Sequence, residues 1–277
     1  MPRSCAPVRR DGAAMRHSPR SWRRRKARTG HPSHRPRHGP HEDQGPRIRA
    51  MDRLTSAAWA ALPWLIAGLG LVVVHAAVLL PRQPEPAPDV PDADTKPSYA
   101  QLTTWRLIAA CLVICLACQP LLMTAPGAQR PAWLVWSSGF AVLATVDAVS
   151  TWIPRGLTRL CLIELAVGLG LGALVWGDAS ALLGAALGAC ALGAMFWALW
   201  RFGAGIGFAD VRMAVGVGAL TGSVSWDFLI MAVFAAAIIG ALWGVIHRLV
   251  AGPGRVFAYA PALWAGPWVA QLAQHLA

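Results

Sequence analysis

The chain has 277 residues, of which 56% are hydrophobic and only 14% are charged. A soluble domain carries about a quarter charged residues, so this composition argues against a soluble globular protein. The formal net charge of +12 arises in the first fifty residues, which hold 14 of the 25 Lys and Arg side chains and three acids. The remaining chain, with 11 basic and 10 acidic residues, is therefore nearly neutral.

Residues 1–50 are rich in Arg, His, Pro and Ser and contain almost no aliphatic side chains. Because such a segment cannot bury a core, we expect a disordered basic tail, followed by a membrane-embedded domain over residues 51–277. A basic tail can bind nucleic acid or anionic lipid. We favour an interpretation in which the working protein begins at Met51, and we expect no nucleic-acid partner.

The chain after Met51 consists of apolar runs joined by short polar connections. A membrane-spanning helix needs about 20 mostly apolar residues, and helices satisfy their own backbone groups in lipid. We therefore predict an all-α, polytopic transmembrane helix bundle with seven or eight membrane segments. The predicted segments are 58–80, 107–123, 132–153, 160–176, 179–200, the short 211–221, 228–246 and 256–276.

Basic residues concentrate on three of the connections, at 155–159, 201–212 and 247–255. Cytoplasmic loops carry an excess of Lys and Arg, and these three connections share one side if segment 211–221 enters the membrane. We predict a multi-pass protein of the cytoplasmic membrane with this side facing the cytoplasm. The Pro-rich connection 81–100 lies on the same side.

Three cysteines, Cys111, Cys115 and Cys118, fall on roughly one face of the segment 107–123. This spacing allows a metal site, but no His or carboxylate nearby completes it. Buried cysteine usually packs as a small hydrophobic side chain, which is the interpretation we favour. We predict no metal ion and no cofactor.

Two carboxylates occupy unusual positions in this apolar chain. Asp147 lies about 22 Å along the helix that starts at Ala132, inside a hydrocarbon core about 30 Å thick. Asp210 begins the short segment 211–221, and the predicted topology places both acids on the cytoplasmic side at similar depth. Ionisable side chains inside membranes usually mark function.

Two carboxyl groups that share a site of low dielectric hold one proton between them. One can then take a proton from water while the other gives a proton to a carbonyl oxygen or leaving amine, as in aspartic proteases. The alternative is that each aspartate caps a helix or pairs with Arg155 or Arg212. Gly203, Gly205 and Gly207 precede Asp210 and would allow tight backbone turns and close approach of a substrate chain.

Two sequence motifs carry a family likeness. "GIGFADVRMAVGVGALTG" resembles the second active-site motif of the type IV prepilin peptidases, which are GxGD intramembrane aspartic proteases; Gly205, Gly207, Asp210 and Met213 match. "DAVSTWIPRGLT" resembles the first motif, with matches at Asp147, Pro154, Leu157 and Thr158. The likeness extends from Met51 to the C-terminus and is clearest from Leu143 to Pro267.

The resemblance implies Asp147 and Asp210 as catalytic residues. It also implies substrate binding by Gly205, Gly207, Ala209, Arg212 and Pro154. Ala209 stands where the family has glycine before the aspartate, and Arg212 stands where it has lysine. The connection 81–100 lacks the cysteine pairs of the larger family members, so the resemblance implies a short form with peptidase activity and without N-methylation.

The function implied is removal of the leader peptide of a type IV prepilin-like precursor, of the Tad/Flp or pseudopilin type, at the cytoplasmic face. The partners would be that membrane-embedded precursor and the lipid bilayer. Two alternatives stay open: a proton-coupled transporter in which the same acids relay protons, and a catalytically inactive family member. Glu164, the other carboxylate expected in the membrane, lies close to the same side, which disfavours a relay across the bilayer.

Overall fold

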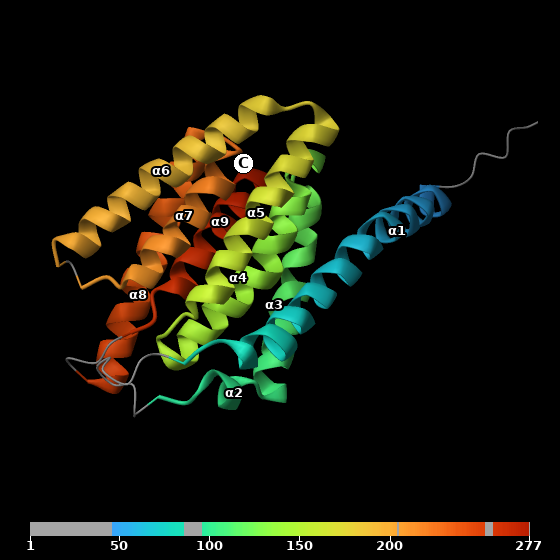
Figure 1. Ribbon diagram of the computed structural model, residues 1–277. Coiled ribbons are helices and arrows are strands. Elements are labelled where there is room, and N and C mark those ends of the chain that lie inside the picture. Colours follow the sequence, from blue (N-terminus) through green and yellow to red (C-terminus); the bar gives the residue numbers. More distant parts are fainter. Residues whose placement is uncertain (1–45, 86–95, 204, 253–256, 277) are drawn as a thin grey trace, which may run out of the picture. The chain divides into compact units, whose positions relative to one another are not determined.

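The computed structural model describes residues 46–85, 96–203, 205–252 and 257–276. Our prediction for residues 1–50 therefore lies almost entirely outside the described residues. The described part is helical and contains no strand (Figure 1). Its longer elements are α1 (Pro46–Val73), α3 (Trp105–Thr124), α4 (Arg130–Ser150), α5 (Arg155–Trp176), α6 (Ala179–Arg201), α7 (Phe208–Gly222), α8 (Trp226–Ala251) and α9 (Ala260–Leu276).

The predicted all-α bundle is confirmed, since every predicted apolar segment is a helix. Six helical stretches among the described residues are long and apolar enough to cross a membrane: 55–82, 105–124, 127–150, 155–176, 179–201 and 226–250. The chain is therefore a membrane protein. Helices α7 and α9 are shorter, with 15 and 17 residues. Helix α9 starts four residues later than predicted because residues 257–259 are not helical.

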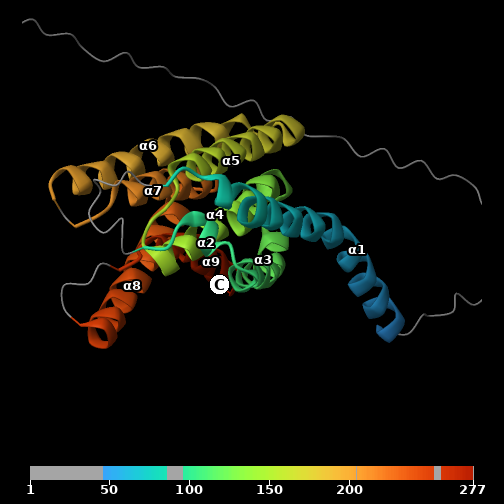
Figure 2. The same ribbon diagram turned by 60° about the horizontal axis from the view of Figure 1, so that its bottom comes forward.

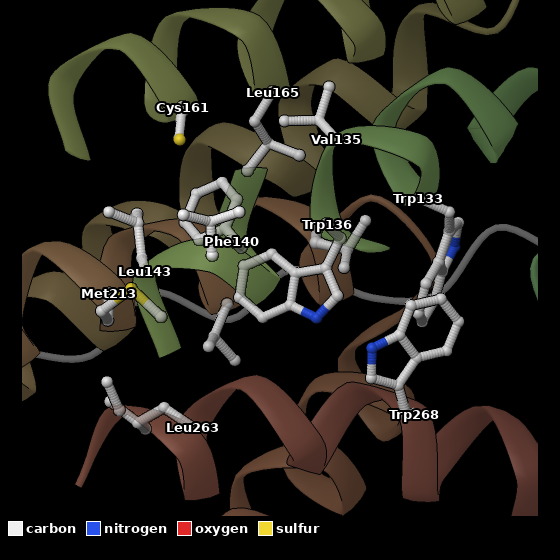
Figure 3. Packing of buried hydrophobic residues seen from close by; sticks show 14 of the residues in the cluster. Trp133, Val135, Trp136, Phe140, Leu143, Cys161, Leu165, Met213, Leu263 and Trp268 are labelled. Carbon is white, nitrogen blue, oxygen red and sulfur yellow. The ribbon is translucent and has the colours of Figure 1, made fainter. Parts of the chain in front are cut away.

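Helix α4 lies at the centre of the packing. The most apolar 18-residue stretch of the span that contains α4 is 78% buried, whereas the corresponding stretches of the other five candidate spans are only 22–33% buried. Trp133, Trp136 and Phe140 on this helix are fully buried and pack against the residues drawn in Figure 3. A polar side chain on α4 is therefore held away from lipid by its neighbours.

Two tryptophans fix α9 against α4. The indole N–H of Trp136 donates to the carbonyl oxygen of Trp264 at 3.1 Å, and the indole N–H of Trp264 donates to the carbonyl oxygen of Trp136 at 2.9 Å. Farther along the same pair of helices, the rings of Trp133 and Trp268 lie 4.6 Å apart. These contacts hold the first two turns of α4 against α9.

Helices α6 and α7 lie side by side (Figure 2), and glycines allow them to pack closely. A Cβ atom at Gly188 would collide with the carbonyl oxygen of Gly218, and one at Gly184 would collide with that of Gly222. The four glycines form two small-xxx-small pairs, a pattern that brings membrane helices together. Helix α7, which carries Asp210, therefore depends on α6 for its position.

The end of the first span departs from α-helix, which the sequence did not predict. Val74–Leu79 forms a π-helical turn (η1) and Leu80–Arg82 a 3₁₀ turn (η2). Just beyond, the Gln83 side-chain oxygen accepts a hydrogen bond from the backbone N–H of Leu157 at 3.0 Å. The segment leading into the first connection is thus attached to α5. The short helix α2 (Tyr99–Leu102), capped by Ser98, lies near the end of that connection.

Candidate active site

Asp147 lies in the last turn of α4 and is only 5% exposed. Its carboxylate oxygen Oδ2 accepts a hydrogen bond of 3.0 Å from the backbone N–H of Ala260, the first residue of α9. The first N–H groups of a helix have no partner within the helix, and its N-terminus favours negative charge. Asp147 therefore occupies an electrostatically favourable position made by two helices far apart in the sequence.

Asp210 lies in the first turn of α7. Its Oδ2 atom accepts a hydrogen bond of 3.1 Å from the backbone N–H of Gly207. Burial raises the pKa of the Asp210 carboxyl to about 6, although this hydrogen bond and the charge of Arg212 act in the opposite direction. This hydrogen bond caps the N-terminus of α7, which is the alternative role that the sequence allowed for Asp210. Asp210 is thus a capping residue that is also partly buried.

The structure brings the two aspartates to the same end of the bundle. Asp147 lies within electrostatic range of Asp210, and Tyr259, the residue before Ala260, also lies within range of Asp210. Burial raises the pKa of the Tyr259 phenol, and the Asp210 charge adds to the effect. The carboxyl groups, 63 residues apart in the sequence, thus face a common region between α4, α7 and the start of α9.

The glycines before Asp210 differ in their roles. Gly203 and Gly205 have φ angles of +76° and +73°, which side-chain-bearing residues rarely adopt, and a Cβ at either would meet nothing within 4 Å. Gly207 has φ −77° and ψ 152°, which any residue can adopt. Our expectation that these glycines allow backbone turns closed to other residues is therefore wrong for Gly207. Gly207 contributes here through the hydrogen bond that its backbone N–H donates to Asp210.

Arg212 and Ala209 lie on either side of Asp210 in the sequence. Arg212 is within electrostatic range of Asp210, Arg155 and Arg159, and burial together with the two arginines lowers its pKa. The Arg212 Nε atom is buried and has no hydrogen-bond partner, while its guanidinium lies 5.9 Å from the Phe208 ring centre. Ala209 packs against the hydrophobic core. Substrate binding by both residues stays a prediction.

Pro154 is buried where α5 begins, and its carbonyl oxygen accepts hydrogen bonds from the N–H and hydroxyl groups of Thr158. Pro154 thus shapes the turn between α4 and α5, and its contact with substrate stays a prediction. Helix α4 ends before it, at Ser150, and the next residue, Thr151, adopts a left-handed conformation with φ 57°.

Lys96 is a site residue that sequence reasoning missed. Its Nζ atom donates a hydrogen bond of 2.6 Å to the Thr151 hydroxyl oxygen and lies 4.5 Å from the centre of the Trp152 ring. Its charge is also within electrostatic range of Asp147. The sequence around Lys96, near the end of the acidic, Pro-rich connection, does not indicate this role, because the Thr151 hydroxyl group that it contacts lies 55 residues later in the chain.

An apolar groove of about 380 Å³ lies next to Asp147. Ala148 and Pro261, the neighbours in sequence of Asp147 and Ala260, line one part of it. Small side chains on α4 and aromatic side chains on α8 and α9 form the walls, and the lining residues include Ala144, Thr145, Ile239, Trp243, Trp264 and Ala265. The groove is therefore suited to an apolar chain, and its lining includes the residues that follow Asp147 and Ala260 in the sequence.

The side chains that could hold a metal ion do not belong to this site. Among the described residues, a possible metal-binding group consists of His75, Cys161 and Glu164 and includes neither aspartate. Cys111, Cys115 and Cys118 lie instead in the hydrophobic core around α3. The chemistry that the aspartate site itself offers is proton transfer between two carboxyl groups.

Comparison with known proteins agrees with this geometry. Residues 134–245 match the model of the type IV leader peptidase family, Peptidase_A24. The matched region contains both Asp147 and Asp210. No curated protein and no solved structure matches the chain significantly. Residues 134–245 are therefore similar to the type IV leader peptidase family, as the two sequence motifs indicate, and this similarity supports a peptidase of that general kind.

Proposed function

We propose that this protein is an aspartic endopeptidase that removes the leader peptide of a type IV prepilin-like precursor at the cytoplasmic face of the cell membrane. The single observation that carries the proposal is the convergence of Asp147 and Asp210 at one end of the bundle, inside the region that matches the leader peptidase family. The family supplies the general activity, and the two carboxyl groups supply the mechanism.

In this mechanism the two aspartates share one proton. The ionised carboxylate takes a proton from a water molecule, which attacks the carbonyl carbon of the scissile peptide bond. The protonated carboxyl group gives its proton to the carbonyl oxygen and, as the intermediate collapses, a proton passes to the leaving amine. Burial raises the pKa of Asp210 to about 6, so this carboxyl group keeps its proton to a higher pH than an exposed aspartate does.

Neighbouring groups fit this role. The N–H of Ala260 holds the Asp147 carboxylate in one orientation, and the N–H of Gly207 does the same for Asp210. Lys96 places a positive charge within range of Asp147 and fixes Thr151, one turn beyond it. Preorganised groups of this kind act on charge that develops during the reaction without needing to reorganise.

The groove beside Asp147 supports a substrate that is itself a membrane helix. Its lining is almost wholly apolar and is built from α3, α4, α8 and α9. A prepilin-like precursor has a hydrophobic helix directly after its leader, and this helix would enter from the lipid and lie in the groove. Arg212, which lies near Asp210, and its neighbours Arg155 and Arg159 would then face the polar part of the substrate or lipid phosphates.

The test is cleavage of a prepilin-like precursor by the purified protein in lipid vesicles. Asp147→Asn and Asp210→Asn each keep an oxygen that accepts the hydrogen bond of Ala260 or Gly207, so each is expected to fold and to lose at least about 100-fold in rate. Asp227→Asn, which changes an exposed carboxylate at the start of α8, is the matched control. Cleavage retained in either aspartate variant would refute the mechanism.

A further inference from the structure

Three metal-ligating side chains meet inside the bundle at a place that the proposed peptidase mechanism does not use. His75 lies on the π-helical turn η1, and Cys161 and Glu164 lie on α5. One ligand atom from each lies within 4.8 Å of the other two. His75 and Cys161 are completely buried, whereas the Glu164 side chain is 26% exposed. Single-turn π-bulges occur frequently at functional sites.

The hydrogen bonds of His75 fix which ring nitrogen faces the cluster. Its Nδ1 atom lies 2.7 Å from the carbonyl oxygen of Leu71, which can only accept, so Nδ1 carries a hydrogen. The opposite nitrogen, Nε2, lies 2.9 Å from the Glu164 carboxylate oxygen Oε2. In the neutral imidazole both of these atoms are acceptors, so a cation must sit between them. It is either a proton, held by the histidine or by the Glu164 carboxyl group, or a metal ion.

The thiol of Cys161 favours the metal ion. A proton shared by His75 and Glu164 uses two of the three groups and gives the thiol no role. Figure 3 shows the Cys161 side chain directed from α5 into the packed interior. A divalent ion bound by a thiolate, a carboxylate and a neutral imidazole forms a group of zero net charge. Such a group is far cheaper to bury in a low-dielectric interior than an uncompensated ion.

Gly139 on α4 leaves the room that an ion requires. A Cβ atom at this position would lie 2.9 Å from the Cys161 Sγ atom and 3.3 Å from the His75 Nε2 atom. The glycine therefore faces the space between two of the ligands. Gly139 is eight residues from Asp147 on the same helix, about 12 Å at 1.5 Å per residue, so this space is separate from the aspartate site.

We propose that His75, Cys161 and Glu164 bind a divalent transition-metal ion, with Zn²⁺ as the physiological ion. Nitrogen, sulfur and oxygen ligands suit Zn²⁺, whereas Mg²⁺ and Ca²⁺ prefer oxygen alone. A tetrahedral Zn²⁺ site has ligand atoms about 3.3–3.6 Å apart. On binding, the Cys161 side chain therefore turns inward by about 1 Å, and the His75 Nε2 and Glu164 Oε2 atoms, now 2.9 Å apart, separate slightly. The hydrogen bond from His75 Nδ1 to Leu71 is the outer contact that typically orients a metal-bound imidazole.

The ion would attach the end of the first span to α5. The Gln83 side chain already accepts a hydrogen bond from the backbone N–H of Leu157, which lies two helical turns before Glu164 on α5. The metal site would therefore be a second attachment between the same two segments. The site does not depend on the proposed peptidase mechanism. Metal binding can fail while cleavage is retained, and the reverse is equally possible.

The test uses the purified full-length chain, stripped of metal by a chelator and titrated with Co²⁺ as a spectroscopic substitute for Zn²⁺. We expect about one ion per chain and a thiolate-to-cobalt charge-transfer band, which Zn²⁺ abolishes by displacement. His75→Gln, Cys161→Ala and Glu164→Gln should each weaken binding at least about tenfold. Cys190→Ala, which removes an exposed thiol from α6, is the matched control and should bind as the wild type does.

A second pair of variants leaves all three ligands in place. Gly139→Ala puts a methyl group between the ligands and should also weaken binding at least about tenfold, whereas Gly170→Ala, with nothing within 4 Å of its added Cβ, should not. Absence of the charge-transfer band in the wild-type protein would overturn the proposal even if the variants fail to fold. Equal binding by the ligand variants and Cys190→Ala would overturn it as well.

Discussion

The carboxylate of Asp147 accepts a hydrogen bond of 3.0 Å from the backbone N–H of Ala260, a residue 113 positions later in the chain. This contact joins the last turn of α4 to the first turn of α9. The reciprocal hydrogen bonds between Trp136 and Trp264 hold the same two helices together. Asp147 is thus oriented by tertiary packing. Its counterpart Asp210 is oriented by its own helix N-terminus, through Gly207.

Stability should depend on pH through Asp210. Burial raises its pKa in the folded protein from 3.8 to about 6, so the folded state binds the proton more tightly than the unfolded state does. The free energy of unfolding therefore falls as pH rises from about 4 to about 6 and is level above that. Allowing for the partial exposure of the side chain, we expect a loss of about 1 kcal/mol.

The measurement is thermal unfolding in detergent micelles between pH 4 and pH 7. The difference between the wild type and Asp210→Asn should follow the decline, because asparagine does not titrate. The difference between the wild type and Asp227→Asn should not follow it, since Asp227 is exposed. If the stability of Asp210→Asn relative to the wild type is the same at pH 4 and pH 7, Asp210 is not buried as described.

Lys96→Met should lower the cleavage rate about tenfold, at the lower end of the effects of removing an electrostatic group from an active site. The variant removes a charge within range of Asp147 and the hydrogen bond to Thr151. Lys96→Arg keeps the charge and should restore most of the rate. The matched control is Arg82→Met, which removes an exposed charge from the end of η2. An equal loss in Lys96→Met and Arg82→Met would mean that Lys96 has no particular role at the site.

The packing of α6 against α7 should be sensitive to a single methyl group. In Gly188→Ala the new Cβ meets the carbonyl oxygen of Gly218, so the helices must separate. We expect a loss of about 1–3 kcal/mol in unfolding free energy, together with reduced cleavage because α7 carries Asp210. Gly170→Ala makes the same change where nothing lies within 4 Å. Thermal unfolding that is equal in the two variants would contradict the close contact.

The groove beside Asp147 should select for an apolar substrate segment. Ala265→Leu fills part of the groove from α9 and should raise KM for a precursor in vesicles severalfold with little effect on kcat, because it removes binding that is equal in the ground and transition states. Ala186→Leu, the same change at an exposed position on α6, should leave both constants unchanged. Unchanged KM and kcat in Ala265→Leu would place the groove outside the substrate path.

The helices of this protein could be predicted from the sequence because long apolar runs have one stable form in lipid. Asp147 and Asp210 could be singled out because carboxylates are rare in such runs. Their partners could not, because the N–H of Ala260 and the charge of Lys96 reach Asp147 only through tertiary packing. The same holds for His75 and Glu164, which are 89 residues apart. Glu164 could be predicted as an intramembrane acid, but no pattern in the sequence indicates the π-helical turn that carries His75.

The central claim is that Asp147 and Asp210 act as one catalytic unit, and a double-mutant cycle tests it most directly. Cleavage of a precursor in vesicles would be measured for the wild type, Asp147→Asn, Asp210→Asn and the double variant. Residues that act as a unit are strongly non-additive, so the double variant should be no slower than either single variant, each reduced at least about 100-fold. Losses that multiply in the double variant, or a single variant that still cleaves at the wild-type rate, would contradict the shared mechanism.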